Sequence, residues 1–410
     1  MTVKKSADPR LLLFAGASFA AIIAYAFGFN ILGPNAVVMM DYFGIRQSGQ
    51  GLVMAVQSSG ELLVSALLVV YGERFGKLAL TALGVGLLSA ACLAIGAIPL
   101  FPSAIPPYGA LLFFAALLGA SFSLINTMVN ASIPEVFSDR RDLFHPLVHS
   151  FYSAGAMCAP FLVTLLVNER EPHSYAVPFL AFGGYATLVL CFYLISVRLA
   201  LPLTPYAAPA KAVPTRTSGS FFVFRQPKIW LLSIVMLSYI SFSISVGSWL
   251  PAYCSQFAHM SFRFSGLILT VFNCGALVMR FFFPLVLRRI DFRRYFIAAG
   301  LLSSACMLAA LLLRGDIPVA VFVALSGFFQ GGMGLCLFML CNSVFPGHSG
   351  SVSAFVILIG GLANTLAPYF MGKAADLVGF RIPFLCIVAL LAFSALLLRA
   401  FIRGGVVPEA

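Results

Sequence analysis

Long apolar runs, separated by short charged or Pro/Gly-rich breaks, cover most of the chain. Runs such as 78–100 and 382–402 are apolar on every face, whereas a strand of a membrane β-barrel alternates apolar and polar residues. A helix needs about 20 apolar residues to cross the hydrocarbon of a bilayer. The pattern therefore predicts twelve membrane-spanning helices, at 11–40, 50–71, 77–101, 107–133, 146–168, 176–198, 228–254, 263–287, 294–313, 317–345, 349–372 and 380–402.

One long polar connection interrupts this series. It covers residues 199–227 and contains Pro202, Pro205, Pro209 and Pro214. Proline-rich polar segments of this kind act as linkers rather than as parts of a packed core. The chain is therefore predicted to consist of an N-terminal six-helix half (1–198), a cytoplasmic linker (199–227) and a C-terminal six-helix half (228–410).

The two halves resemble each other in sequence. Residues 87–92 read LLSAAC and residues 301–306 read LLSSAC. At one constant offset, Gly119 aligns with Gly327, and Ala159-Pro160 aligns with Ala367-Pro368. Several matches in one register favour an internal duplication, which is typical of transporters that work around a central site.

Composition and charge support a membrane protein and exclude several other classes. The chain is 61% hydrophobic and 9% charged, too apolar for a soluble core of 410 residues. The net charge of +12 includes no basic run beside a polar face that could follow a phosphate backbone, so nucleic acid is not an expected partner.

The distribution of Lys and Arg predicts the orientation in the membrane. With both termini placed in the cytoplasm, 18 of the 25 basic residues lie in cytoplasmic segments, six lie outside, and Arg280 lies within a span. Basic residues favour the cytoplasmic side. We therefore expect an integral protein of the bacterial inner (plasma) membrane with cytoplasmic termini.

No residue pattern points to catalysis or to a bound metal. The nine cysteines show no paired-ligand spacing and are interpreted as packing residues. The acidic residues and histidine at 135, 139, 142 and 145 are spaced as in a solvated loop, without a nucleophile or metal motif. We expect no enzyme activity, no cofactor and no metal.

Two loop motifs resemble those of the major facilitator superfamily. The turn at 71–77, YGERFGK, resembles its acidic-Arg-x-Gly-basic loop, although Val69 stands where a glycine is usual. The segment 371–379, MGKAADLVG, resembles its exit from helix eleven. The resemblance implies the all-α major facilitator fold, with twelve transmembrane helices in two six-helix halves and a monomer as the working unit.

Within the superfamily, the chain is similar to the fucose/glucose/galactose symporter family. The similarity lies in residues 43–52, in Asn130, in LVHSFYSAGA at 147–156 and in residues 359–368. Some members of that family carry an Asp in helix one and a Glu in helix four for proton coupling. This chain has Gly33 and Asn126 there, so coupling to H+ would need another carboxyl group.

Glu61 is the candidate for that carboxyl, because it alone among thirteen acidic residues lies near the middle of a predicted span. A charge at the centre of a membrane helix costs about 2.5–3.5 kcal/mol, so such a residue usually faces a cavity, carries a proton or has a partner. His149 could share the proton, since imidazole titrates near neutral pH. The alternatives are a structural Glu61 that locks helix packing and an interfacial His149 with no coupling role.

The resemblance implies which helices line a substrate cavity, and these helices carry most of the polar residues in the middle of spans. Amides beside aromatic rings suit a neutral polyhydroxylated solute, since amides bond hydroxyls and rings stack on apolar sugar faces. Hydrogen bonding between helices is the alternative role. The candidate substrate-binding residues are Tyr25, Asn30, Gln57, Asn126, Asn130, Tyr152, Trp249, Asn273, Gln330 and Asn364.

Three further charged residues are candidates for gating. Glu73 and Arg74 lie in the loop after the second span, where they could form ion pairs at an inner gate or act only as topology signals. Arg280 lies near the inner end of the eighth span, which favours a structural or gating role over contact with an anionic substrate.

The sequence thus predicts a secondary active transporter that takes up a small polar solute, a sugar or polyol, by proton-coupled alternating access. An exporter of amphipathic compounds is one alternative, favoured by 41 phenylalanines and by the two missing family carboxylates. A non-transporting membrane sensor on the same scaffold is the other, although the short termini and loops show no signalling domain.

Overall fold

The computed structural model describes residues 8–72, 75–101, 107–204, 226–258, 260–344 and 349–403. Within these ranges every regular element is helical and no strand occurs. Twelve of the described helical segments are long and apolar enough to cross a membrane, and each coincides with one of the predicted spans. The predicted all-α membrane fold with twelve spans is confirmed.

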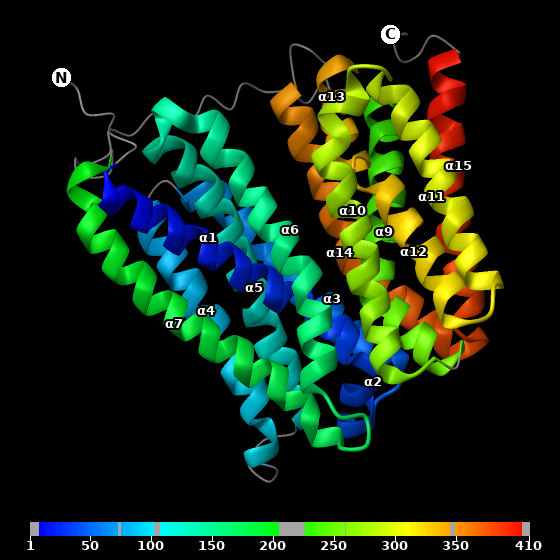
Figure 1. Ribbon diagram of the computed structural model, residues 1–410, viewed down its shortest axis with the longest axis horizontal. Helices are drawn as coiled ribbons and strands as arrows, with labels where there is room; N and C mark the ends of the chain where they lie inside the picture. The colour runs from blue at the N-terminus through cyan, green and yellow to red at the C-terminus, as the bar shows by residue number, and fades with distance from the viewer. Residues whose placement is uncertain are drawn as a thin grey trace. The chain divides into compact units, whose positions relative to one another are not determined.

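The chain folds into two compact units, and the first contains Met1–Gly44 and Val56–Thr215. In this unit α1 packs against α6 and α7, while α4 packs against α5 and α7 (Figure 1). Short 3-10 helices lie at Ile98–Leu100, Ser138–Arg140, Pro172–Tyr175 and Leu201–Leu203. The α-helices are α1 (Pro9–Phe29), α2 (Leu32–Phe43), the larger part of α3 (Gln47–Tyr71), α4 (Lys77–Ala97), α5 (Pro107–Val136), α6 (Arg141–Leu166) and α7 (Ala176–Ala200).

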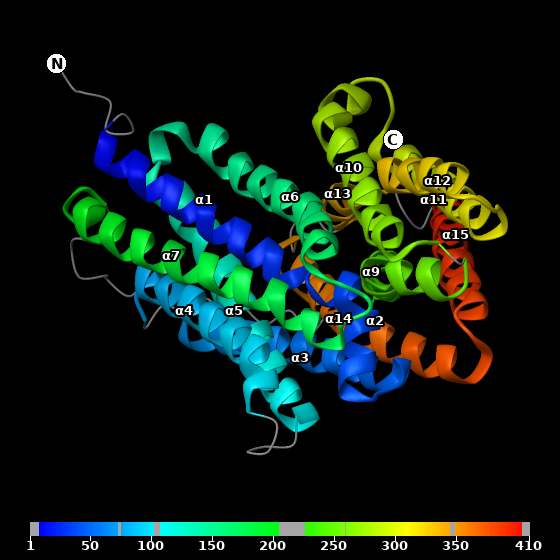
Figure 2. The ribbon, with the colours of Figure 1, turned by 60° about the horizontal axis from the view of Figure 1, so that its bottom comes forward.

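The second unit contains Arg216–Ala410 together with Ile45–Ala55, which includes the first turns of α3. Here α9 packs against α14 and α15, α10 packs against α12, and α11 packs against α12 and α15 (Figures 1 and 2). Its helices are α9 (Pro227–Gln256), α10 (Phe262–Leu287), α11 (Phe292–Leu312), α12 (Asp316–Gln330), α13 (Met333–Val344), α14 (Ser349–Val378) and α15 (Arg381–Arg403).

These units resemble the two predicted halves, with one difference that the sequence did not suggest. A single helix, α3, is shared: it starts in the second unit and continues into the first. Most of the predicted linker 199–227 lies outside the described residues. The exact domain boundaries therefore stay a prediction.

Helix ends follow local capping chemistry. Asp8 and Asp291 each accept a hydrogen bond from the backbone N–H two residues further on, and Ser261 accepts one from Phe264. Such side chains satisfy backbone donors that the first turn leaves without partners. Gly44 and Gly379 follow α2 and α14 with φ of 62° and 74°, a conformation that glycine adopts without strain.

In the first unit α3 and α5 cross at unusually short range, because glycines face the backbone of the other helix. A Cβ on Gly60 would overlap the Ala116 carbonyl oxygen, and a Cβ on Gly119 would overlap that of Gln57. Small residues that let backbones approach are a typical basis of helix association in membranes.

The second unit repeats this crossing between α10 and α12. A Cβ on Gly275 would overlap the Ala324 carbonyl oxygen, and a Cβ on Gly327 would overlap that of Phe272. The two glycines are spaced from the opposing carbonyls as in the first unit, and Gly327 is the residue that aligns with Gly119. The sequence repeat thus corresponds to a repeated packing contact.

Two of the predicted spans are broken helices. The expected run 11–40 divides at Asn30–Ile31 into α1 and α2, and the run 317–345 divides at Gly331–Gly332 into α12 and α13. Hydropathy averaged over a whole span does not register such breaks, because the residues on both sides of them are mostly apolar. Interrupted helices in membranes are tolerated where other groups satisfy the freed backbone.

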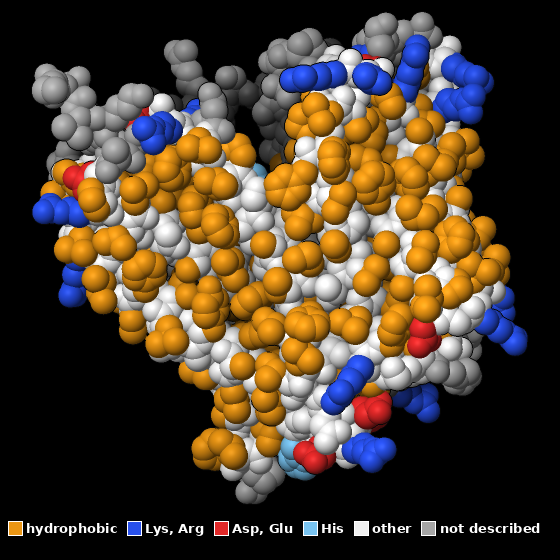
Figure 3. Space-filling view, in the orientation of Figure 1, with side chains coloured by type: hydrophobic (Ala, Val, Ile, Leu, Met, Phe, Trp, Pro, Cys, Tyr) orange, Lys and Arg blue, Asp and Glu red, His pale blue; other side chains and the backbone are white. Residues whose placement is uncertain are grey.

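Figure 3 shows apolar side chains over most of the lateral surface of each unit, with Lys and Arg gathered at the ends. Exposed side chains such as Leu188, Phe281 and Leu377 would be unfavourable in water but suit lipid contact. The surface therefore agrees with the membrane assignment.

The glycine crossings generate a stability prediction. Gly119→Ala and Gly327→Ala should each destabilise the protein by about 1–3 kcal/mol, because the added methyl forces the two helices apart. The midpoint of thermal unfolding in detergent measures this effect. Gly184→Ala and Gly247→Ala are matched controls, since a Cβ there meets nothing within 4 Å. Equal unfolding midpoints for the crossing and control variants would contradict the assigned role.

Candidate functional site

Glu61 is positioned by the helix crossing in the first unit. It follows Gly60 directly on α3, and a Cβ on Gly119 of α5 would lie 3.0 Å from the Glu61 backbone nitrogen. The side chain is half-buried. The crossing therefore fixes the backbone that carries this carboxyl group.

A pair of tyrosines lies beside Glu61. The Tyr25 hydroxyl on α1 is hydrogen-bonded to Tyr152 on α6 and lies within electrostatic range of the Glu61 carboxyl. The two tyrosine rings are 5.1 Å apart. Another close approach holds them: a Cβ on Gly155 of α6 would lie only 2.7 Å from that of Ala26 on α1. The sequence-predicted Tyr25, Glu61 and Tyr152 thus come together from three helices.

Aromatic rings flank this group. Tyr25 lies 5.3 Å from Phe122 and 6.0 Å from Phe29, and those two phenylalanines lie 5.6 Å from each other, measured between ring centroids. A carboxyl and two hydroxyls beside apolar ring faces can bond hydroxyl groups and stack on a carbon ring. The sequence does not single out Phe29 or Phe122, because 41 phenylalanines are spread along the chain.

The four predicted amides of the first unit are partly engaged with their own helices. Asn30 donates to the Ala26 carbonyl at 2.9 Å and ends α1 at the break. Asn130 donates to both the backbone and the side-chain oxygen of Asn126, while its own Oδ1 is buried without a hydrogen bond to any described residue. Gln57 is buried at the α3–α5 crossing.

His149 lies one turn before Tyr152 on α6. Its side chain is exposed, and its ring meets that of His145 edge-on at 5.5 Å. The role of His149 in proton coupling therefore stays a prediction.

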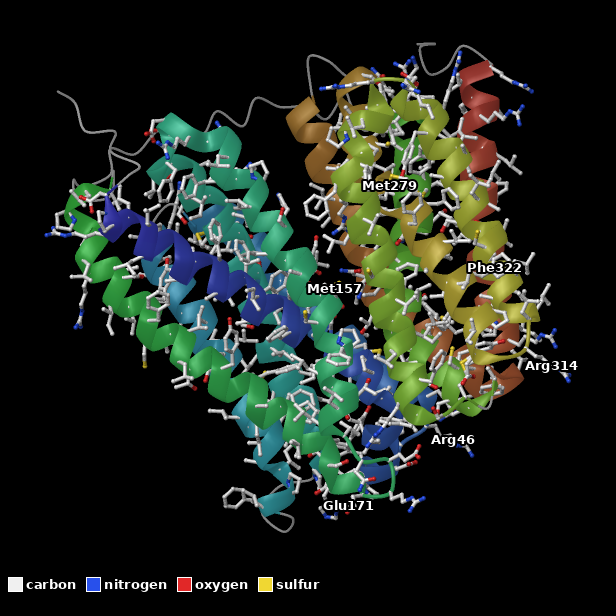
Figure 4. The ribbon with its side chains drawn as sticks, viewed as in Figure 1. Arg46, Met157, Glu171, Met279, Arg314 and Phe322 are labelled. Carbon is white, nitrogen blue, oxygen red and sulfur yellow. The ribbon has the colours of Figure 1, made fainter. Side chains whose placement is uncertain are left out.

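In the second unit Arg280 forms a hydrogen bond at the break in the predicted tenth span. Its Nε donates to the Gly331 carbonyl at 3.4 Å, at the level of α10 marked by Met279 in Figure 4. Tyr295 of α11 donates to the Phe329 carbonyl at 3.0 Å, in the last turn of α12. Tyr239 of α9 is hydrogen-bonded to the Gly334 backbone and lies near the Arg280 guanidinium.

The remaining predicted residues occupy separate positions in the second unit. Trp249 is fully buried and donates its indole N–H to the Pro368 carbonyl at 3.0 Å. Gln330 is buried at the end of α12, and its Nε2 has no hydrogen-bond partner among the described residues. Asn273 on α10 and Asn364 on α14 are half-buried.

The two other gating candidates, Glu73 and Arg74, lie outside the described residues. The structure instead reveals an acidic contact that sequence analysis did not single out. Asp376 of α14 accepts hydrogen bonds from the backbone N–H groups of Gln47 at 3.1 Å and Ser48 at 2.9 Å, one with each carboxylate oxygen. It thereby caps the start of α3, where unpaired donors and the helix dipole favour a negative charge.

A second contact fixes the same turns of α3. A Cβ on Gly51 would lie 2.7 Å from the Pro368 carbonyl oxygen of α14. We call this contact between residues 47–51 and residues 368–376 the α3–α14 clasp. The acidic residue in the 371–379 motif was the available sequence signal, but nothing in the sequence showed what it would bind.

Two arginines of the predicted outer loops belong to the second unit. Arg46, directly before α3, and Arg314, two residues before α12, lie at the same end of this unit (Figure 4).

In the described part of the chain, no group of three or more His, Cys, Asp or Glu side chains could hold a metal ion.

Twelve apolar spans among the described residues, in two units with a repeated crossing, define a polytopic α-helical membrane protein. The family model of the Major Facilitator Superfamily matches residues 18–368 and 258–409. The chain therefore belongs to the major facilitator superfamily and is a membrane transporter of small molecules rather than an enzyme.

Two bacterial relatives have names that include a solute. The chain is 26% identical to the cyanate transport protein CynX of Escherichia coli, over 70% of this chain and 74% of that protein. It is 24% identical to a putative glucose/galactose transporter of Helicobacter pylori, over 60% of this chain and 64% of that protein. A crystal structure of a D-xylose-proton symporter shares the fold, with a TM-score of 0.73, 13% identity and coverage of 97% of this chain and 98% of that one.

The clasp yields a test of the Asp376 contact. Asp376→Ala should lower the free energy of unfolding by about 1 kcal/mol, because two backbone donors of α3 lose their acceptor. Asp376→Asn should lose less, since the amide oxygen can accept one of these bonds. Thermal unfolding in detergent measures both variants. The control is Lys373→Ala, an exposed change one turn away, and an Asp376→Ala protein as stable as this control would argue against capping.

Proposed function

We propose that this transporter takes up a small polar, uncharged solute of the sugar or polyol class by alternating access, driven by protons that Glu61 carries. The observation that carries the proposal is the cluster of Tyr25, Tyr152 and Glu61 beside Phe29 and Phe122. It combines hydrogen-bonding groups with aromatic faces in one unit, which is the chemistry that recognises a sugar ring.

The two named relatives point to different solutes, a hexose and the cyanate anion. Glu61 favours the hexose type, because the carboxyl and its tyrosine neighbours offer hydrogen bonds to hydroxyl groups but no positive charge to an anion. Arg280, the cation within a span, donates to the backbone at the α12–α13 break. A neutral solute therefore fits the placement of charges better than an anionic one.

Glu61 is suited to proton coupling because a carboxyl in a membrane helix is stable when protonated and can release its proton when a polar cavity opens to it. Its neighbours Tyr25 and Tyr152 are neutral donors and acceptors, so a solute hydroxyl can bond the protonated carboxyl and the solute and the proton can be carried together. His149, one turn from Tyr152, is proposed to pass protons toward this group. Asn126 and Asn130 are proposed to add hydrogen bonds to the solute from α5.

Alternating access is supported by the division into two units that share α3. Motion of one unit against the other requires either bending of α3 near Ala55–Val56 or release of its first turns from α14. We assign the α3–α14 clasp the role of a latch on the outer side. We assign Arg280, Glu73 and Arg74 to gating on the inner side. The working unit is proposed to be a monomer in the bacterial plasma membrane with both termini in the cytoplasm.

Glu61→Gln tests the coupling. In proteoliposomes this variant should lose proton movement driven by substrate, because the amide cannot bind a proton at this step, yet retain counterflow exchange of the solute. Proton uptake is followed with a pH-sensitive dye and exchange with labelled solute. Glu171→Gln, an exposed change in the outer loop labelled in Figure 4, is the control. Undiminished proton uptake by Glu61→Gln would reject the role of this residue.

A ligand screen tests the solute class. A sugar or polyol at about one hundred times its Kd should stabilise the purified protein by about 2.7 kcal/mol, while cyanate and lipophilic cations should not. Tyr152→Phe, which removes one hydroxyl of the cluster, should weaken this stabilisation. Tyr185→Phe on α7, outside the cluster, should not. Stabilisation by cyanate or by lipophilic cations alone would instead indicate an anion transporter or an exporter of amphipathic compounds.

A further inference from the structure

A basic cavity lies between α11 and α15 in the second unit, away from the proposed solute site. Its volume is about 560 Å³, and four arginines line it: Arg293, Arg294, Arg399 and Arg403. Figure 3 shows basic side chains gathered at this end of the unit, where α11 begins and α15 ends. Asp291 is the one acidic side chain in the lining, so the cavity carries a net positive charge.

Arg293 is the residue that indicates a ligand. Only 8% of its surface is exposed, and its Nε has no hydrogen-bond partner among the described residues. Asp291 Oδ1 accepts from the backbone N–H of Arg293, as the cap of α11. The guanidinium carbon lies 4.9 Å from the centroid of the Phe292 ring. A buried guanidinium nitrogen without an acceptor is costly, and a ligand oxygen in the cavity would satisfy it.

The geometry favours a phosphate group. Arginine presents a planar fork of donors that matches phosphate oxygens, and several arginines around one cavity can share a phosphate with more than one negative oxygen. The other lining residues are apolar, among them Ile297, Leu301 and Ile402, which belong to the membrane-spanning segments of α11 and α15. The cavity therefore has cationic groups at the ends of two spans and an apolar wall formed by the spans themselves.

We propose that this cavity binds the phosphate of an acidic phospholipid, with the arginines on the headgroup and the acyl chains along Ile297, Leu301 and Ile402. Basic pockets between membrane helices at the cytoplasmic side suit such headgroups, and the distribution of Lys and Arg predicts that this end is cytoplasmic. Asp291 can accept a hydrogen bond from a hydroxylated headgroup, so phosphatidylglycerol is the lipid of choice for the test.

The experiment measures lipid binding to the purified full-length chain by native mass spectrometry and by thermal shift, with dioleoylphosphatidylglycerol, dioleoylphosphatidylcholine or sodium phosphate added. The double variant Arg399→Gln/Arg403→Gln removes two exposed arginines of the cavity. The matched control, Arg288→Gln/Arg289→Gln, removes two exposed arginines at the same end of the unit that do not line the cavity. Arg293→Gln tests the buried guanidinium separately.

Wild type and control should bind phosphatidylglycerol and be stabilised by it, whereas the cavity variant should bind about tenfold more weakly, the change expected from losing a charged hydrogen bond. Phosphatidylcholine should not substitute. Equal binding by the cavity variant and the control would overturn the proposal in favour of general surface charge. Stabilisation by sodium phosphate that equals the lipid effect would assign the site to a free phosphate and overturn the lipid assignment. Neither readout depends on transport.

Discussion

The close approach of backbones at glycine is the contact on which the rest of this structure depends. Apolar side chains gain little by leaving lipid for one another, so helices in a membrane associate through tight packing and a few polar contacts. At Gly60 and Gly119, α3 and α5 leave no room for a Cβ, and Gly275 and Gly327 do the same for α10 and α12. In the first unit the same crossing carries Glu61, so the packing contact and the proposed proton site are one structural feature. The second unit has Ala276 after its glycine, which explains how two copies of one packing unit can differ in chemistry.

The breaks in the helices illustrate the second constraint, that backbone groups within a membrane need partners. At Gly331–Gly332 the freed carbonyls of Phe329 and Gly331 accept from Tyr295 and Arg280. An arginine within a span is unfavourable by itself, but here it satisfies an oxygen that glycine exposes. The charge and the break therefore stabilise each other. At Asn30 the side chain and the backbone N–H both bond the Ala26 carbonyl, a local solution without a charged residue.

Hydropathy alone predicted the fold class and all twelve spans, because the requirement for apolar length is strict in a bilayer. It did not predict the two breaks, since one asparagine or a pair of glycines changes the mean hydropathy of a span very little. The sequence also named Glu61, Tyr25 and Tyr152 as candidates, since polar residues are rare in the middle of spans, and their functional role stays a proposal. It could not show that Trp249 donates to a carbonyl within its own unit, or that Asp376 caps a helix more than three hundred residues away in the sequence. Those roles depend on tertiary contacts, which a list of polar residues does not contain.

The shared helix α3 has a consequence for how the protein is made. Ile45–Ala55 packs with the second unit, yet it is synthesised with the first. When the ribosome has completed the first six spans, the start of α3 still lacks the carboxylate of Asp376 and the backbone of α14 beside Gly51. The second unit, in turn, cannot be completed from residues 216–410 alone. The start of α3 therefore acquires these contacts only once α14 has been made, so a segment synthesised more than three hundred residues later completes the packing of an early one.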